Sequence, residues 1–241
     1  MINIVVPMAG NSEFFDNSNY SFSKPLVEIN GKTMIEHFIE NMSQINTVVK
    51  FIFIISNEDS SRYHIDDALS LLTNQKCEII KIDGKTKGAA CSALMAIKYI
   101  NNNSPLVIVN YDQVIFADLN KVIKVLSKCD AGVITFESIH PKWSYVKLND
   151  GKHVSEVAEK KPLSKNAIAG FYFYTKGFDF IESAKSMIKK DVRVNESFFV
   201  SLTFNELILM NKKIATFPID SNNYHSFYSP RKIEEYERIT K

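Results

Sequence analysis

At 241 residues, with 45% hydrophobic and 23% charged residues, the chain has the size and composition of a soluble globular protein with a sizeable core. Its net charge of +2 gives no electrostatic case for binding nucleic acid, and no apolar run reaches the roughly 18 residues needed to cross a membrane. Three scattered cysteines without metal-ligand spacing indicate reduced thiols, so we expect a cytoplasmic protein.

The first part of the chain alternates strand and helix patterns. Residues 2–8 form a continuous apolar run, which predicts a parallel strand buried on both faces and lacks the basic segment of a signal peptide. Thr33 and Glu36 fit a capping box for a helix whose apolar spacing extends to Met42. Similar patterns predict strands at 51–55, 77–82, 106–110 and 131–136, and helices at 60–72, 88–100 and 119–126. This order indicates a doubly wound α/β sheet with parallel strands.

The second part is richer in strands. The turn residues Asn149, Asp150 and Gly151 separate strands predicted at 145–148 and 154–158. Further strands are predicted at 168–174 and 214–219, and helices at 178–188, 198–210 and 230–240. Since no linker, repeat or low-complexity tract divides the chain, we predict a single domain of residues 1–241 with a β-rich lobe on the substrate side.

Two predicted loops follow strands at the carboxyl edge of the sheet, where α/β proteins bind ligands. The loop of residues 9–23 can cradle a phosphate with its backbone N–H groups, and Gly10 would allow a close approach; an ordinary surface loop is the alternative. The second loop contains Asp112, which either holds a divalent cation or caps a turn. Lys24, held in extended geometry by Pro25, either neutralises a phosphoryl group or is a solvated surface lysine.

Short motifs are spread over nearly the whole chain. Beyond the opening strand, its loop and Lys24-Pro25, they lie at 88–94, 110–113, 140–145, 157–162, 169–172, 205–208, 219–220 and 229–230. Together they resemble the sugar-phosphate nucleotidyltransferases, in particular a bacterial subgroup that serves surface polysaccharide biosynthesis. The resemblance implies a Rossmann-like, doubly wound mixed sheet of the nucleotide-diphospho-sugar transferase type, with a nucleotide-binding half at 1–138 and a sugar-phosphate-binding half at 139–241.

The resemblance also implies a reaction and its residues. A nucleoside triphosphate would react with a sugar or polyol phosphate, with Mg²⁺ as cofactor and release of pyrophosphate. No nucleic acid and no membrane insertion are implied, and an oligomer is compatible with the resemblance. The matching positions are Lys24 and Asp112 for catalysis; Met8, Ala9, Gly10, Lys87, Gly88 and Ala89 for the nucleotide; Trp143, Glu159, Lys160 and Gly170 for the acceptor; and Asp112 with Asp220 for the metal. For Trp143, packing inside the protein is the alternative to stacking on a ligand.

The first loop departs from the family pattern. The family loop reads Gly-x-Gly-Ser/Thr-Arg, whereas Ser12 replaces the second glycine here and Phe14 replaces the arginine that grips the triphosphate. Lys87, and after it Lys85, are the candidates to restore positive charge. Three functions therefore stay open: a nucleotidyltransferase, a glycosyltransferase or other nucleotide-sugar enzyme on the same scaffold, and a catalytically weakened relative that binds nucleotide.

Overall fold

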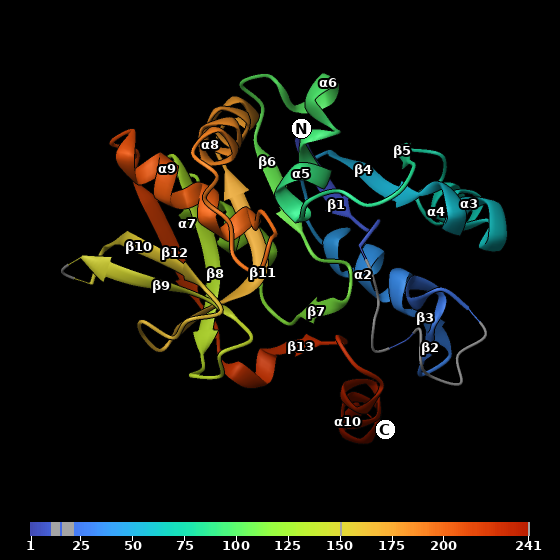
Figure 1. Cartoon of the computed structure of the whole chain (residues 1–241). Helices are drawn as coiled ribbons and strands as arrows, with labels where there is room; N and C mark the ends of the chain where they lie inside the picture. The colour runs from blue at the N-terminus through green and yellow to red at the C-terminus, as the bar shows by residue number, and fades with distance from the viewer. Residues whose placement is uncertain (11–14, 16–21, 150, 241) are drawn as a thin grey trace.

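A nine-stranded mixed sheet forms the centre of the protein (Figure 1). The structure is a computed structural model, and it describes residues 1–10, 15, 22–149 and 151–240. Four neighbouring strands run parallel in the order β6, β1, β4, β5, with bounds Leu106–Val109, Ile2–Pro7, Val49–Ser56 and Cys77–Ile82. Their side chains are mostly buried apolar residues, as expected for strands covered on both faces.

The sheet changes direction next to β6. Strand β11 (Asn166–Tyr174) pairs antiparallel with β6 and joins the strands of the second half to those of the first. Beyond it lie β9, β10, β8 and β12, with bounds Ser144–Asn149, His153–Glu159, Ala131–Glu137 and Ile214–Pro218. The sheet is therefore mixed, as the family resemblance implies, and the all-parallel sheet predicted from the strand–helix order alone is wrong beyond β6.

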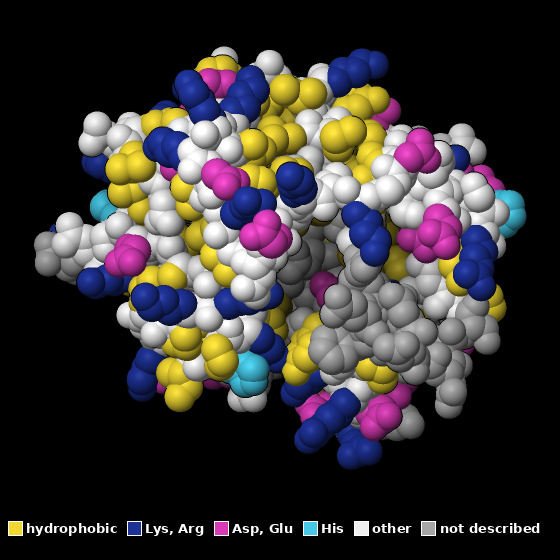
Figure 2. All heavy atoms as spheres, in the orientation of Figure 1, with side chains coloured by type: hydrophobic (Ala, Val, Ile, Leu, Met, Phe, Trp, Pro, Cys, Tyr) yellow, Lys and Arg dark blue, Asp and Glu magenta, His cyan; other side chains and the backbone are white. Residues whose placement is uncertain are grey.

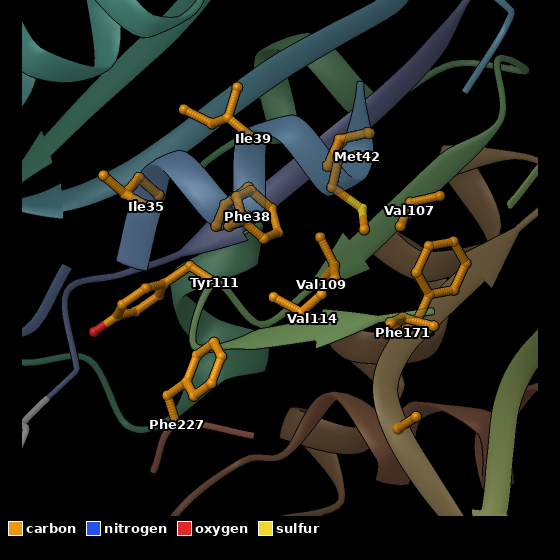
Figure 3. Packing of buried hydrophobic residues seen from close by; sticks show 14 of the residues in the cluster. Ile35, Phe38, Ile39, Met42, Val107, Val109, Tyr111, Val114, Phe171 and Phe227 are labelled. Carbon is orange, nitrogen blue, oxygen red and sulfur yellow. The ribbon is translucent and has the colours of Figure 1, made fainter. Parts of the chain in front are cut away.

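Helices cover both faces of the sheet (Figure 1). Helix α2 (Met34–Met42) begins with the predicted capping box of Thr33 and Glu36. Its residues Ile35, Phe38, Ile39 and Met42 belong to one hydrophobic cluster with Val107, Val109 and Phe171 (Figure 3). The other helices are α3 (Asn57–Tyr63), α4 (Ile65–Leu72), α5 (Ala89–Leu94), α6 (Ile97–Ile100), α7 (Leu119–Leu126), α8 (Gly177–Lys189), α9 (Thr203–Leu209) and α10 (Pro230–Thr240).

Three predicted helices are shorter or broken. The helix predicted at 60–72 is divided into α3 and α4 by His64, whose φ of 52° is left-handed. The helix predicted at 88–100 is divided into α5 and α6, and Gly88, with φ of 115°, precedes its first residue. The helix predicted at 198–210 is α9, preceded by a 3₁₀ turn over Val200–Leu202. Apolar spacing continues across each break, so periodicity alone does not reveal it.

Two short β-ribbons lie outside the main sheet. Strand β2 (Glu28–Ile29) pairs with β3 (Lys32–Thr33). Strand β7 (Gln113–Ile115) pairs antiparallel with β13 (Tyr224–Ser226), so the C-terminal segment contacts the turn that follows β6. Neither β7 nor β13 was expected from the sequence.

The surface carries one apolar region of note. Figure 2 shows hydrophobic side chains near the top of this face, around α5, α6 and α8, and the exposed Met95, Ile97 and Phe178 belong to or adjoin these helices. Such a region suits contact with another protein chain, and the oligomer that the sequence leaves open stays a prediction. Among the described residues, no helix is both long and apolar enough to cross a membrane.

Candidate active site

Lys24 and Asp112 form a partly buried ion pair beside the carboxyl ends of β1 and β6. Lys24 Nζ lies 2.5 Å from Asp112 Oδ2, and the two side chains are 9% and 19% exposed. The ammonium also lies 5.2 Å from the ring centre of Phe15 and 5.6 Å from that of Tyr111. The sequence thus identified two residues that the fold brings together, and the solvated-lysine alternative for Lys24 is excluded by its burial.

Pro25 explains why Lys24 is held here. Lys24 and Pro25 open a 3₁₀ turn, Lys24–Leu26, in which the proline occupies an early position where its missing N–H costs nothing. The carbonyl of Lys24 accepts a hydrogen bond from the N–H of Val27, and Pro25 is buried. The lysine side chain is therefore presented from a stiff segment.

The turn that carries Asp112 is held by the C-terminal ribbon and by β11. The N–H of Phe227 donates to the carbonyl of Asp112 at 2.7 Å. The neighbouring Gln113 is buried; its Oε1 accepts from the hydroxyl of Tyr224, and its Nε2 donates to the carbonyls of Ala169 and Gly170. Figure 3 shows Tyr111 and Phe227 lying near this turn. The position of Asp112 thus depends on segments far away in the sequence.

Gly170 is required at this junction by its backbone and its surroundings. Its φ is +57°, and a Cβ there would lie 2.4 Å from Gln113 Oε1 and 2.7 Å from Asn110 Nδ2. Its carbonyl accepts from the N–H of Asn110 at 3.1 Å. Packing of β11 against the turn therefore accounts for a glycine here, and the predicted acceptor contact stays a prediction.

Two adjoining cavities open beside the ion pair. The larger, about 720 Å³, is lined by Met8, Ala9, Gly10 and Lys24. The smaller, about 220 Å³, shares Met8, Gly10 and Lys24 and adds Asp112. The predicted first-loop nucleotide residues and both predicted catalytic residues therefore surround one connected space. Its volume lies in the range typical of small-molecule sites.

The far wall of the larger cavity contains residues that the sequence analysis missed. Arg62 and Tyr63, at the end of α3, line it together with Lys85. Carboxylates are present as well, since Glu58, Asp59 and Asp83 line the same wall. No pattern in the sequence marks Arg62, because its place at the cavity depends on how α3, which follows β4, packs beside the loop after β1.

The predicted nucleotide residues at 87–89 have a different setting. Lys87 is exposed and does not line either cavity, while its carbonyl accepts from the N–H of Phe198. A Cβ on Gly88 would lie 2.5 Å from the carbonyl oxygen of Phe198, so glycine is needed for this close contact. Gly88 and Ala89 also lie outside the lining of both cavities. Of the two candidates for restoring positive charge, Lys85 is the one that lines the cavity.

The predicted acceptor residues Glu159 and Lys160 lie at the end of β10. Glu159 is buried and accepts hydrogen bonds from the hydroxyls of Ser144 and Ser201. Burial raises the pKa of Glu159, and the two serine hydrogen bonds oppose that rise without cancelling it. Lys160 is exposed, with a left-handed φ of 55° and its Nζ 5.3 Å from the ring centre of Phe199.

Trp143 lies in a third cavity. Its ring packs against Phe136 and Tyr224, as the packing alternative predicted, and part of it faces the cavity. Trp143, Glu159 and Lys160 are absent from the lining of the two cavities at Lys24 and Asp112. Contact of these three residues with an acceptor stays a prediction.

Asp220 and Asp112 are not brought together. Asp220 is exposed and caps the 3₁₀ turn Ser221–Asn223, its Oδ1 accepting from the N–H of Asn222. In the β7–β13 ribbon, Asn223 pairs with Phe116 and Phe227 with Asp112. Asp112 lies at one end of the ribbon, and Asp220 lies beyond Asn223 at the other end; four residues, or about 13 Å of strand, separate these two ends. A metal shared by Asp112 and Asp220 stays a prediction.

The described residues contain no group of three or more His, Cys, Asp or Glu side chains arranged to hold a metal ion. Ser12, Glu13 and Phe14, which carry the departures from the family loop, lie outside the described residues.

A family model described as nucleotidyl transferase matches residues 19–207. The chain belongs to the nucleotidyl transferase family. Among characterised proteins, it is similar to 2-C-methyl-D-erythritol 4-phosphate cytidylyltransferase of Wigglesworthia glossinidia brevipalpis, with 26% identity over 164 residues. That similarity covers 66% of this chain and 65% of the relative, so the chain spans less than two thirds of that protein.

Several solved structures share this fold. A nucleoside-diphosphate-sugar pyrophosphorylase from Vibrio cholerae RC9 has a TM-score of 0.83 at 21% identity, covering 98% of this chain and 99% of that one. A UDP-glucose pyrophosphorylase complexed with UDP-glucose has a TM-score of 0.76 at 16% identity, and the match covers 100% of this chain and 98% of that one. The inositol-1-phosphate CTP transferase of T. maritima has a TM-score of 0.71 at 15% identity, and the match covers 99% of this chain and 95% of that one. These likenesses confirm the predicted nucleotidyltransferase-type fold.

Proposed function

We propose that the protein transfers a nucleotidyl group from a nucleoside triphosphate to a sugar or polyol phosphate and releases pyrophosphate. The observation that carries the proposal is the partly buried Lys24–Asp112 pair beside the space lined by Met8, Ala9 and Gly10. Membership of the nucleotidyl transferase family supports the reaction class. The similar proteins include a cytidylyltransferase, a CTP transferase and nucleotide-sugar pyrophosphorylases, and this supports the acceptor class.

The residues fit Mg²⁺ as a cofactor that arrives with the triphosphate. Mg²⁺ is commonly held by one or two carboxylates, several waters and substrate phosphates, and Asp112 offers one carboxylate beside the cavity. Asp112 would hold the ion, which would supply positive charge against the phosphate oxygens.

Lys24 would stabilise the charge that develops during transfer. In the reaction, an acceptor phosphate oxygen forms a bond to the α-phosphorus while the bond from that phosphorus to the pyrophosphate oxygen breaks. The ammonium of Lys24 would leave Asp112 and donate to the phosphoryl oxygens, and the backbone at Gly10 would orient the phosphates. Because the protein forms no covalent bond in this scheme, catalysis consists of positioning and charge neutralisation.

The charges in the larger cavity favour a modest affinity for triphosphate. Arg62, Lys85 and Lys24 are opposed by three carboxylates on the same lining. In the sequence, Phe14 stands at the position of the family arginine. We therefore propose that Arg62 and Lys85 supply part of the positive charge that the loop lacks.

A substrate panel tests the function. The protein is incubated with each of four nucleoside triphosphates, Mg²⁺ and a panel of sugar and polyol phosphates, and pyrophosphate is assayed. The proposal is supported if pyrophosphate release requires both a triphosphate and an acceptor. This release should be lost in Lys24→Ala and kept in Lys32→Ala. Lys32 is a matched control because it is exposed and pairs with Glu40. Turnover of nucleotide sugars with an acceptor, without any pyrophosphate release, would instead indicate a glycosyltransferase.

A further inference from the structure

A third cavity, here called the aromatic pocket, lies between α10 and the second half of the sheet. Its volume is about 610 Å³, which is enough for a small-molecule ligand. It shares no lining residue with the two cavities at Lys24 and Asp112. Its walls come from α10, from β13 and the residues after it, and from the connection between β8 and β9. It is therefore a separate space from the proposed catalytic site.

Aromatic rings form much of its wall. Trp143 lies 5.6 Å from Tyr224 and 6.3 Å from Tyr228, measured between ring centres, and both pairs are edge-to-face. Phe136 and Tyr236 line the same pocket. Trp143 and Tyr228 are only partly buried, so part of their surface is available to a ligand. Planar ligands stack on such rings with little dependence on their exact identity.

Cations accompany the rings. Lys142 Nζ lies 3.6 Å from the ring centre of Tyr228 and 4.3 Å from that of Trp143. In the described part of the chain, no carboxylate lies within ion-pair distance of Lys142. Lys232 and Arg238 also line the pocket, whose one carboxylate, Glu235, pairs with Lys232. Arg238 in turn pairs with Glu234 outside the lining, so among the described residues Lys142 is the lining cation that is left without a carboxylate.

His225 does not add to this charge near neutral pH, because burial lowers its pKa below the ordinary value of 6.5. A pocket of this kind is complementary to a ligand with two parts, a flat ring and an anionic group. A ring alone would leave Lys142 without an anion, and an anion alone would leave the aromatic wall uncovered.

We propose that the aromatic pocket is a second ligand site, which binds a small molecule that carries both a planar ring and a phosphate. The planes of Trp143 and Tyr228 are nearly perpendicular, so the ligand ring stacks on one of them and meets the edge of the other, and the phosphate accepts hydrogen bonds from Lys142. Nucleotides and aryl phosphates share this chemistry. The site does not depend on the proposed transfer reaction.

Trp143 provides a direct measurement, because it is the single tryptophan of the chain. Its fluorescence is followed while the full-length protein is titrated with adenosine monophosphate, cytidine monophosphate and phenyl phosphate. Adenosine, inorganic phosphate and ribose 5-phosphate are titrated in parallel as molecules with only one of the two features. We expect saturable changes with the first three, and binding at least about tenfold tighter than with their separate parts, which corresponds to 1.4 kcal/mol.

Two variants test the contacts. Lys142→Gln should weaken binding of adenosine monophosphate about tenfold and leave the weaker binding of adenosine unchanged. Lys185→Gln is the matched control, since Lys185 is exposed on α8 and pairs with Glu182. Lys24→Ala should leave the Trp143 response intact. Circular dichroism of each variant checks that the fold is kept.

Three results would overturn the proposal. One is the absence of any saturable change with the ring-bearing phosphates up to about 10 mM, weaker than the usual range of specific sites. Another is ribose 5-phosphate binding as tightly as adenosine monophosphate, which would indicate a site for acceptor-like phosphates. The third is loss of the response in Lys24→Ala, which would mean that the ligand binds in the catalytic cavity.

Discussion

Lys24 Nζ and Asp112 Oδ2 lie 2.5 Å apart although 88 positions separate the two residues in the chain. In the proposed reaction this ion pair would have to break, so that Lys24 can contact the phosphoryl group and Asp112 can hold Mg²⁺. The pair therefore keeps a cation and a carboxylate ready in a partly buried place, where charge interactions are stronger than at the surface.

Lys24→Ala should lower turnover by about 100-fold or more, the scale of losing one preorganised charge contact. The fold should be kept, because Pro25 and the 3₁₀ turn remain. Pyrophosphate release under saturating substrates measures the effect, with Lys32→Ala as control. A fall in turnover of less than about threefold would indicate that the ion pair has a structural role and not a catalytic one.

Asp112→Asn should abolish turnover that depends on a divalent cation, because the carboxylate beside the smaller cavity is lost. Asp220→Asn should leave the Mg²⁺ dependence as in the wild type, since Asp220 caps a turn beyond the far end of the ribbon. Turnover is measured against Mg²⁺ concentration for both variants. Equal losses in the two would contradict this expectation and indicate a metal site shared by both carboxylates.

Arg62→Ala should raise KM for the triphosphate about tenfold with little change in kcat, because Arg62 lines the cavity away from Asp112. Initial rates at varied triphosphate concentration give both constants. The control is Arg231→Ala, an exposed arginine on α10 that pairs with Glu235. A fall in kcat at unchanged KM would place Arg62 in the chemical step rather than in binding.

Gly170→Ala should destabilise the protein by about 2–4 kcal/mol, the sum of backbone strain at positive φ and a clash in a packed site. Gly151→Ala separates the two effects. Gly151 has φ of +69°, but a Cβ there meets nothing within 4 Å, so about 1 kcal/mol is expected. Urea unfolding of both variants measures the difference, and equal losses would mean that the contacts with Gln113 and Asn110 relax freely.

Glu159 should make stability depend on pH. Burial raises its folded-state pKa above the ordinary 4.5, so the folded protein binds its proton more tightly than the unfolded chain. The stabilisation is complete below pH 4.5 and is lost as pH rises through the raised folded-state pKa. Glu159→Gln should therefore gain stability relative to the wild type as pH increases over that window.

Urea unfolding at several pH values tests this expectation. Glu156→Gln, an exposed position on the same strand, is the control and should show no such trend. A stability difference between Glu159→Gln and the wild type that stays constant with pH would contradict it.

The elements that the sequence predicted well are those with a strong local pattern. The apolar runs of β1, β4, β6 and β8 and the capping box at Thr33 need no distant partner to be recognised. Strands β7 and β13 have three residues each and exist because they pair with one another across more than a hundred positions, so no local pattern marks them. The break at His64 likewise depends on a single left-handed residue within an apolar repeat.

The same distinction holds for the candidate site, where local sequence features predicted some residues and missed others. Residue type and the position after a strand were enough to single out Lys24 and Asp112, but not to show that they are paired. Arg62 was missed because its place at the cavity follows from the tertiary packing of α3, which no local pattern reveals. The hydrogen bonds from Ser144 and Ser201 to Glu159 join three separate segments, and nothing in the spacing of these residues predicts them.

The pairing of β6 with β11 bears on how the chain is made. As synthesis proceeds, Leu106–Val109 can pair with β1 on one side, but its other side has no strand until Asn166–Tyr174 has left the ribosome. An unpaired, apolar sheet edge is the kind of surface on which nascent chains misassemble. The rate of translation across the intervening residues, and the access of chaperones to that edge, would then set the yield of folded protein.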